Sequence, residues 1–168
     1  MKIEIRGEAA QEALGQLLAG LLRPPLILWL EGDLGTGKTT LTRGILRGLG
    51  HGGAVRSPTF TLLEPYELGP RRLYHLDLYR LGDPEELEYL GLRDLLERDS
   101  ILIVEWPRRG GRVLPAADLE IRLNYRADAR ALEFQSLSPG GEALVMALAA
   151  SLGEPARSTD EAAGEKGY

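Results

Sequence analysis

The sequence predicts an α/β fold in which helices cover both faces of a central sheet of mixed parallel and antiparallel strands, giving three layers. Two largely apolar runs, residues 26–30 and 100–104, are short and uninterrupted, which is typical of strands buried on both faces of a parallel sheet. The first run leads into a glycine-rich loop, residues 32–37, and then into a helical pattern. A strand, a loop and a helix in this order are the unit from which open α/β sheets are built.

Length and composition predict a single cytoplasmic domain. The chain has 168 residues, enough to bury a sizeable core, and we expect residues 1–152 to form one domain and residues 153–168 to form a polar, mobile tail. A net charge of -5 gives no general attraction to nucleic acids or anionic membranes. Cysteine is absent, so disulfides and thiolate metal sites are excluded. We see no signal peptide and no apolar stretch as long as a membrane span.

Two elements are expected before the strand at 26–30, and a helix after the loop. Residues 2–6 alternate between polar and apolar side chains, as in a half-buried strand. Residues 8–22 carry an apolar stripe at helical spacing that two prolines end. Apolar residues recur at the same spacing over 41–49, which predicts a helix ending at Gly50.

A β-hairpin is expected next. The β-forming runs 55–68 and 71–81 flank a Gly-Pro turn signal, which predicts an antiparallel pair. Pro58 and Pro65 either place the first run at a sheet edge or interrupt it, because proline cannot donate to the ladder.

The rest of the chain completes the sheet and its helices. Asp83 precedes a proline and two glutamates, as an N-cap does, so a short helix is expected to follow it. The other expected elements are a helix at 92–98, a strand at 100–104, a Gly- and Arg-rich loop at 108–115, strands at 119–125 and 131–137 that form a hairpin, and a helix at 141–152.

The glycine-rich loop carries the clearest chemical signal. It matches G-x-x-x-x-G-K-[ST], and with its flanking strand and helix it is typical of P-loop NTPase-like proteins, both hydrolases and kinases. The loop N–H groups and the positive end of the helix bind an anion, Lys38 reaches the outer phosphates, and the Thr39 hydroxyl joins the shell of Mg²⁺. The expected phosphate-binding residues are Gly32, Asp33, Leu34, Gly35, Thr36, Gly37, Lys38, Thr39 and Thr40.

Two features that the sequence lacks limit the choice of nucleotide and of metal site. The guanine-reading motif Asn-Lys-x-Asp is missing, because the single asparagine, Asn124, is followed by Tyr-Arg-Ala-Asp, so ATP is expected rather than GTP. His51 and His75 are too isolated to form a metal cluster and are expected to be polar packing or surface residues.

Two acids are candidates to hold Mg²⁺, which P-loop enzymes bind with an acid at the end of a neighbouring strand. Glu105 follows the run 100–104 and so lies at the sheet edge where open α/β sheets bind ligands. Asp77 lies in the second hairpin strand and shares a face with His75. Each acid has a plainer interpretation, Glu105 as a solvated strand end and Asp77 as the partner of an arginine.

Three further features allow more than one interpretation. Residues 57–61 bring three hydroxyls close to a proline, which suits either a segment that senses a γ-phosphate or a threonine-rich edge strand. Trp106 either stacks on a partner or fills the core. The arginines after it contact phosphates, contact a partner or only face solvent; they are Arg108, Arg109 and Arg112.

Five segments together resemble the TsaE (YjeE) family, the small bacterial ATPases of tRNA threonylcarbamoyladenosine biosynthesis. They are GDLGTGKTT at 32–40, SPTFTL at 57–62, HLDLYRL at 75–81, DPEEL at 83–87 and VEWP at 104–107. The resemblance extends from about residue 3 to residue 137. Phe60 stands where a tyrosine is common, which removes only a hydroxyl.

The resemblance implies an ATPase that works with the TsaB and TsaD proteins, which transfer the threonylcarbamoyl group to the adenosine next to the anticodon. ATP hydrolysis then supports repeated turnover, and the chain meets tRNA only through the complex. The implied Mg²⁺ ligands are Thr39 and Glu105, with Asp77 as the second acid. Thr61 and Trp106 fall in segments that the family links to activity. The implied catalytic residues are Lys38, Asp77, Glu105 and Thr61. Glu8 and Arg130 lie where proteins of this family contact the edge of the nucleotide base.

No arginine is evidently placed by the sequence as a finger, a role worth a factor of ~10³ or more in rate. We therefore expect slow hydrolysis by the isolated chain, with the TsaB and TsaD complex supplying or ordering the missing groups at 57–61 or 106–112. Two alternatives remain at this stage. One is a P-loop small-molecule kinase with Arg108, Arg109 and Arg112 as its lid, and the other is a non-catalytic, ATP-switched binding module.

Overall fold

The computed structural model describes residues 1–58 and 60–153. Its strands are β1 (Lys2–Ile5), β2 (Leu26–Glu31), β3 (Leu63–Leu68), β4 (Arg71–Asp77), β5 (Ser100–Glu105), β6 (Leu119–Arg126) and β7 (Ala129–Ser136). Its helices are α1 (Glu8–Leu21), α2 (Lys38–Gly48), α3 (Glu86–Tyr89), α4 (Leu92–Leu95) and α5 (Pro139–Leu152), and a 3-10 segment, η1, covers Pro107–Val113.

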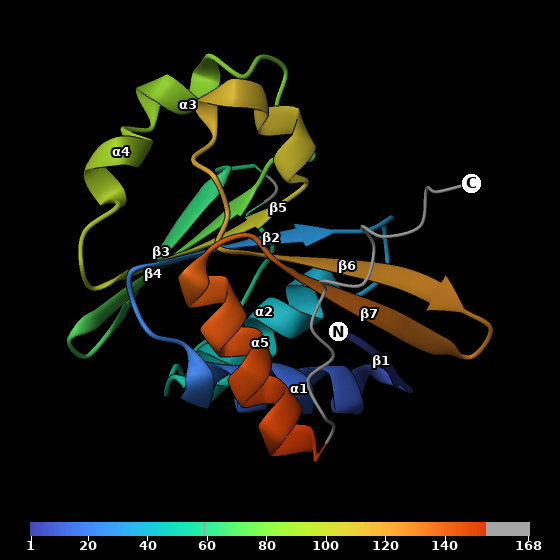
Figure 1. The fold of residues 1–168 in the computed structure, drawn as a ribbon. Coiled ribbons are helices and arrows are strands. Elements are labelled where there is room, and N and C mark those ends of the chain that lie inside the picture. The colour runs from blue at the N-terminus through green and yellow to red at the C-terminus, as the bar shows by residue number, and fades with distance from the viewer. Residues whose placement is uncertain (59, 154–168) are drawn as a thin grey trace, which may run out of the picture.

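The strands form one seven-stranded sheet in the order β1-β7-β6-β2-β5-β4-β3. The four inner strands from β6 to β4 run parallel, while β1, β7 and β3 join antiparallel at the two edges. Figure 1 shows α1, α2 and α5 on one face of the sheet, and α3 and α4 on the other. The predicted three-layer α/β fold with a mixed sheet is therefore confirmed.

The two faces of the sheet pack into two separate hydrophobic clusters, and β5 belongs to both. Its residues Ile101 and Ile103 face the cluster under α1 and α2, whereas Leu102 and Val104 face the other one. Every residue of β5 is buried, as its apolar run predicts. In β2 burial alternates: one face is buried, while Ile27 and Trp29 on the other face are half-buried and pack against the second cluster, so the expectation of burial on both faces holds only in part for that strand.

Helix α1 lies against α2 at very short range, and glycines make this possible. A Cβ atom at Gly15 would come within 2.5 Å of the Leu41 carbonyl oxygen, and one at Gly44 within 2.2 Å of the Glu12 carbonyl oxygen. A side chain at either position would push the helices apart. The start of α2, which follows the glycine-rich loop, is thus positioned by direct backbone contact with α1.

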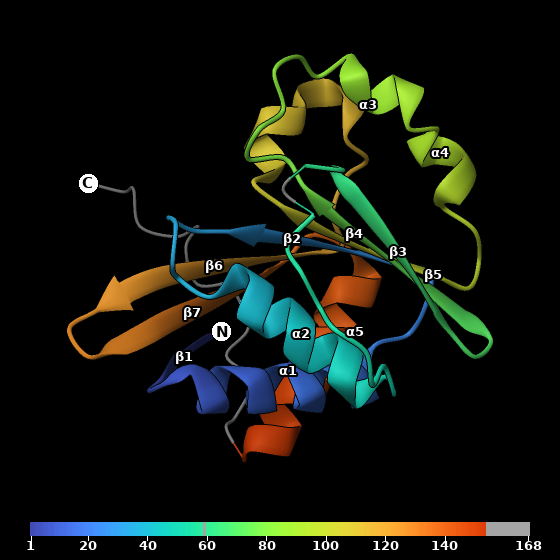
Figure 2. The same ribbon diagram turned by 180° about the vertical axis from the view of Figure 1, so that it is seen from behind.

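The elements differ from the predictions mainly at their boundaries. The first hairpin strand is confirmed as an edge strand, but it begins at Leu63, because residues 54–58 cross from α2 to β3 without ladder partners (Figure 2). Its partner ends at Asp77 instead of residue 81. Residues 108–115 are not an open loop, since most of them belong to the 3-10 segment η1. The second short helix ends at Leu95, three residues early.

Two predictions fall on residues that the structure does not describe. Thr59 lies outside the described residues, and so does the tail from residue 154 onward. Within residues 1–58 and 60–153, no helix has the length and apolar character needed to cross a membrane.

Candidate functional site

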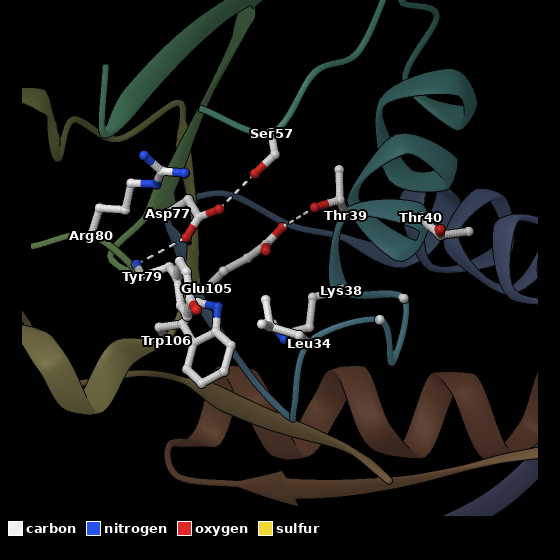
Figure 3. A pocket seen from close by; sticks show the side chains of 12 residues that line it. Leu34, Lys38, Thr39, Thr40, Ser57, Asp77, Tyr79, Arg80, Glu105 and Trp106 are labelled. Carbon is white, nitrogen blue, oxygen red and sulfur yellow. Dashed lines mark hydrogen bonds between the residues drawn. The ribbon is translucent and has the colours of Figure 1, made fainter. Parts of the chain in front are cut away.

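The carboxyl ends of β4 and β5 meet the glycine-rich loop at one edge of the sheet. The two strands pair in parallel so that Asp77 lies beside Glu105 in the ladder. The loop and the start of α2 face these acids across a cavity of about 450 Å³ (Figure 3). The cavity is lined by Leu34, Gly35, Gly37, Lys38, Thr39, Thr40, Ser57, Asp77, Tyr79, Arg80, Glu105 and Trp106.

The glycine-rich loop adopts a conformation that needs its glycines and is clamped by α1. Gly35 and Gly37 have φ angles of 78° and 95°, a region that other residues rarely adopt. The buried side chain of Gln11, on α1, donates hydrogen bonds to the carbonyl oxygens of Thr36 (3.0 Å) and Gly37 (2.8 Å). A Cβ atom at Gly37 would lie 2.2 Å from that amide nitrogen. The loop is therefore held in one shape before any ligand arrives.

Lys38 is buried beside the loop, with only 5% of its surface exposed. Its ammonium donates hydrogen bonds to the carbonyl oxygens of Gly32 (2.6 Å) and Asp33 (3.0 Å), and it lies 4.3 Å from the centroid of the Trp106 ring. Burial lowers the pKa of Lys38, and the nearby carboxylate of Glu105 is the largest opposing influence. An incoming phosphate would offer this ammonium stronger acceptors than the two carbonyls do.

Glu105 is the centre of a buried hydrogen-bond network. Its Oε1 atom accepts a hydrogen bond from the Thr39 hydroxyl at 3.0 Å and lies 2.9 Å from Nε2 of His75. His75 is fully buried, and Glu105 is 3% exposed, so Glu105 is not the solvated strand end that was its plainer interpretation. The predicted Mg²⁺ ligands Thr39 and Glu105 are thus brought together, and His75 supports the carboxylate from behind.

Asp77 accepts hydrogen bonds from the segment between α2 and β3 and from the turn after β4. The Ser57 hydroxyl donates to its Oδ2 atom at 2.5 Å, and the backbone N–H of Tyr79 donates to its Oδ1 atom at 3.0 Å. Among the described residues no arginine forms an ion pair with Asp77, so the structure does not support the arginine-partner interpretation. Asp77 instead ties residue 57 to the end of β4.

The donors around Glu105 suit magnesium, provided that a nucleotide supplies the other ligands. Carboxylate and hydroxyl oxygens are the hard donors that Mg²⁺ prefers, and Mg²⁺ is commonly held by one or two carboxylates plus substrate phosphates. In the part of the chain that the structure describes, no group of three or more histidine, cysteine or acidic residues could hold a metal ion by itself. Thr39 and Glu105 therefore fit an ion that arrives with its nucleotide.

The remaining predicted residues lie outside this cavity. Glu8 and Arg130 line a second hollow of about 300 Å³, which shares Gly35, Gly37 and Thr40 with the main cavity and so lies directly beside the loop. Gly32 and Asp33 line a third hollow of about 250 Å³, and Thr36 is buried beneath the loop. Thr61 is exposed in the turn before β3 and does not line the cavity, so its catalytic role stays a prediction.

The three arginines after Trp106 make different contacts. Arg108 forms ion pairs with Glu31 and Glu120, at 3.3 and 3.4 Å. Arg109 stacks over the rings of Tyr79 and Trp106, at 5.3 and 5.8 Å from their centroids. Arg112 is exposed. None of the three lines the main cavity, and this arrangement offers no lid over it.

Sequence reasoning missed several residues that the structure brings to the site. Gln11 clamps the loop, His75 supports Glu105, and Arg80 lines the cavity although no arginine was expected there. The position of Arg80 could have been inferred from the sequence, because it follows Asp77 by three residues and the strand that ends at Asp77 points into the site. No comparable signal marked Gln11, whose role depends on how α1 docks.

Comparisons with known proteins show which family this chain is similar to. The family model described as "Threonylcarbamoyl adenosine biosynthesis protein TsaE" matches residues 5–132. A Haemophilus influenzae protein named tRNA threonylcarbamoyladenosine biosynthesis protein TsaE is 48% identical over 122 residues, which are 73% of this chain and 77% of that protein. A Bacillus subtilis protein of the same name is 41% identical over 117 residues, 70% of this chain and 73% of that protein. The crystal structure of Bacillus subtilis YdiB superposes with a TM-score of 0.77 at 32% identity and covers 90% of this chain and 95% of that chain.

Proposed function

The chain belongs to the TsaE family of threonylcarbamoyl adenosine biosynthesis proteins, and from that premise we propose that it is a Mg²⁺-dependent ATPase that acts with TsaB and TsaD. Its part in the threonylcarbamoyladenosine modification of tRNA follows from the family. The finer proposal is that it binds ATP in the cavity, hydrolyses it slowly alone, and supports repeated turnover of the TsaB and TsaD complex.

One observation carries the ATPase proposal: a phosphate-binding loop faces two buried acids in the same cavity. Lys38 and the loop suit a triphosphate, while Thr39 and Glu105 suit the magnesium that accompanies it. Thr39 and Glu105 would hold this Mg²⁺, which would neutralise the negative charge that develops on the phosphate oxygens. A passive anion site would not need a buried carboxylate beside it, because the carboxylate repels the anion unless a cation lies between them.

The second hollow beside the loop supports the choice of a nucleotide. Glu8 and Arg130 line it together with Gly35 and Gly37, and we infer that the base and sugar of the nucleotide bind there. Arg130 also lies over the ring of Tyr125, 4.3 Å from its centroid. A guanidinium that already stacks on one aromatic ring can offer its planar face to an adenine. The absence of a guanine-reading motif in the sequence favours ATP over GTP.

The dependence on partners is supported by what surrounds Asp77. Residue 57 is tied to this acid, but the segment that follows carries Phe60, whose surface is 86% exposed. A large apolar side chain this exposed beside an active site suits contact with another protein. TsaB and TsaD are the partners that the family resemblance implies, and tRNA is met only through them.

ATP binding and product analysis test the proposal. We expect calorimetry with Mg²⁺ to detect ATP but not GTP binding, and chromatography to find only ADP and phosphate as products. Lys38→Ala should weaken ATP binding about 10- to 100-fold, because it removes a charge-assisted contact, and should abolish detectable hydrolysis. Lys2→Ala, at an exposed lysine on the edge strand β1, is the matched control.

Three other results would each contradict part of the proposal. Transfer of phosphate from ATP to a small molecule would indicate a kinase. ATP binding without ADP formation at any concentration of TsaB and TsaD would indicate a binding module. Unchanged hydrolysis in Lys38→Ala would show that the reaction does not occur in this cavity.

A further inference from the structure

The cations that face the cavity are few. Asp77 and Glu105 bring negative charge into it, and a triphosphate would add several more charges. Among the described lining residues, only Lys38 and Arg80 are cationic. Lys38 lies at the loop, where it serves the bound nucleotide in its ground state. Charge that develops during phosphoryl transfer needs a cation that acts at the far side of the γ-phosphate.

Arg80 is placed for that task. It follows a turn in which the Tyr79 N–H is bonded to Asp77 and the Leu81 N–H donates to the Leu78 carbonyl oxygen at 3.1 Å, so its backbone is anchored beside the two acids. Figure 3 shows Arg80 and Thr40 on opposite sides of these carboxylates. Within the described part of the chain, the Arg80 side chain forms no ion pair and donates no hydrogen bond.

The guanidinium of Arg80 does have one neighbour, the ring of Phe60. Its Cζ atom lies 4.8 Å from the ring centroid, and Phe60 itself is 86% exposed. A cation and an aromatic ring at an exposed position attract each other by only about 0.5–1 kcal/mol. Such a contact holds the side chain at the cavity edge and is easily exchanged for a charged phosphate.

We propose that Arg80 is a catalytic residue that contacts the γ-phosphate in the transition state, and that its stacking on Phe60 keeps it at the cavity edge in the free protein. The inference rests on the proposed ATPase function. Contact of a partner with Phe60 removes the stacking surface and lets the guanidinium turn inward. Slow hydrolysis by the isolated chain then reflects a misplaced arginine and not a missing one.

The chemical step shows what Arg80 contributes. The oxygen of a water molecule forms a bond to the γ-phosphorus while the bond between this phosphorus and the bridging oxygen breaks. The electron pair of the broken bond stays on the terminal oxygen of ADP. One proton of the water remains on the attacking oxygen, which becomes part of the released phosphate, and the other passes to another phosphate oxygen or to solvent. Negative charge is spread over the equatorial oxygens of the phosphoryl group in transfer, and a planar guanidinium can donate two parallel hydrogen bonds to two of these oxygens, which an ammonium cannot.

Hydrolysis by Arg80→Ala, measured in the complete assembly with TsaB and TsaD, tests the inference. We expect a loss of about 10³-fold in kcat, the usual effect of removing such an arginine, with an unchanged Kd for ATP. Arg80→Lys should recover little, because it restores the charge but not the fork. Arg72→Ala, at an exposed arginine near the start of β4, the strand that precedes Arg80, should match the parent.

Two further readouts separate a catalytic role from a structural one. Added guanidinium ion should partly rescue hydrolysis by Arg80→Ala and leave the parent unaffected. The variant should also lose affinity for ADP with aluminium fluoride, which imitates the transition state, but keep its affinity for ADP alone. A kcat within threefold of the parent in Arg80→Ala would overturn the inference while leaving the ATPase proposal standing. A parent chain that hydrolyses no ATP even with both partners would overturn both.

Discussion

The two walls of the cavity are built in opposite ways. The inner wall, formed by the loop, the start of α2 and the end of β5, holds Lys38 and Glu105 in buried positions with hydrogen-bond partners. The outer wall is formed by Ser57 and Arg80, with Phe60 stacked on Arg80 beside the cavity; Arg80 and Phe60 are exposed, and Ser57 is tied to Asp77 by one hydrogen bond. Rigid, buried sites hold ligands accurately, whereas exposed segments with few contacts open at little cost. The difference indicates that the nucleotide-binding residues already have their binding conformation in the free protein. Hydrolysis then requires a conformational change in the outer wall.

A large loss of activity is expected from a change at the centre of the inner wall. Glu105→Gln keeps the shape of the side chain but removes the charge that suits Mg²⁺, so we expect at least about a 10²-fold loss of kcat and a higher Mg²⁺ concentration for half-maximal activity. The matched control is Glu120→Gln, at a glutamate that is also buried at the sheet but bonds to Arg122 outside the cavity. Similar losses in both variants would mean that the inner wall has no special role.

An intermediate effect is expected where the two walls join. Ser57→Ala removes the hydrogen bond from the outer segment to Asp77, and a bond to a charged group contributes about 1.5–3 kcal/mol. We expect kcat in the presence of TsaB and TsaD to fall about tenfold, with ATP affinity unchanged. Ser57→Thr keeps the hydroxyl and should lose less. A fall in ATP affinity as large as the fall in kcat would contradict the division between the walls.

A smaller effect of opposite sign is expected at the exposed tip of the outer wall. Phe60→Ala removes the ring on which Arg80 stacks, so basal hydrolysis should rise about two- to fivefold, and stimulation by TsaB and TsaD should shrink. Tyr89→Ala is the control, since Tyr89 is an equally exposed aromatic residue on α3. Basal and stimulated rates that both stay at the parent level would show that Phe60 does not position the Arg80 side chain.

The smallest effect is expected on thermal stability, because burial of the charged Lys38 in the inner wall destabilises the fold. Burial lowers the pKa of Lys38 below its ordinary value of 10.5, so the folded protein binds this proton less tightly than the unfolded chain. The charged lysine therefore destabilises the fold at neutral pH, and this penalty fades as the pH rises through the lowered pKa toward 10.5. Lys38→Met should melt a few degrees higher than the parent at pH 7, with a gap that narrows as the pH rises. A gap that is constant from pH 7 to pH 10 would contradict this.

Much of the inner wall could be predicted from local sequence patterns. The run ending at Glu105 and the loop ending at Lys38 follow strand and loop rules that depend on neighbouring residues only. Parallel strands that flank one another bring their ends to the same edge, which is why Asp77 and Glu105 could be expected together. The two short helices after Asp83 could also be anticipated, because the Asp83 side chain and the Glu86 side chain cap the turn reciprocally.

The outer wall could not be predicted in the same way. Residues 55–58 have the composition of a strand, but they belong to the connection between α2 and β3 and join no strand of the sheet. Gln11 reaches the loop because glycines allow α1 to approach α2, a contact between elements that periodicity does not encode. Arg80 faces the cavity because a turn after Asp77 redirects the chain. Each of these features depends on tertiary packing overriding local preference.

The most direct test of the two-wall interpretation is steady-state ATP hydrolysis by the chain alone and with purified TsaB and TsaD, alongside ATP affinity under both conditions. We predict that the partners raise kcat at least about tenfold and leave the Kd for ATP unchanged, because they complete the outer wall without altering the inner one. Equal turnover with and without the partners would contradict this interpretation.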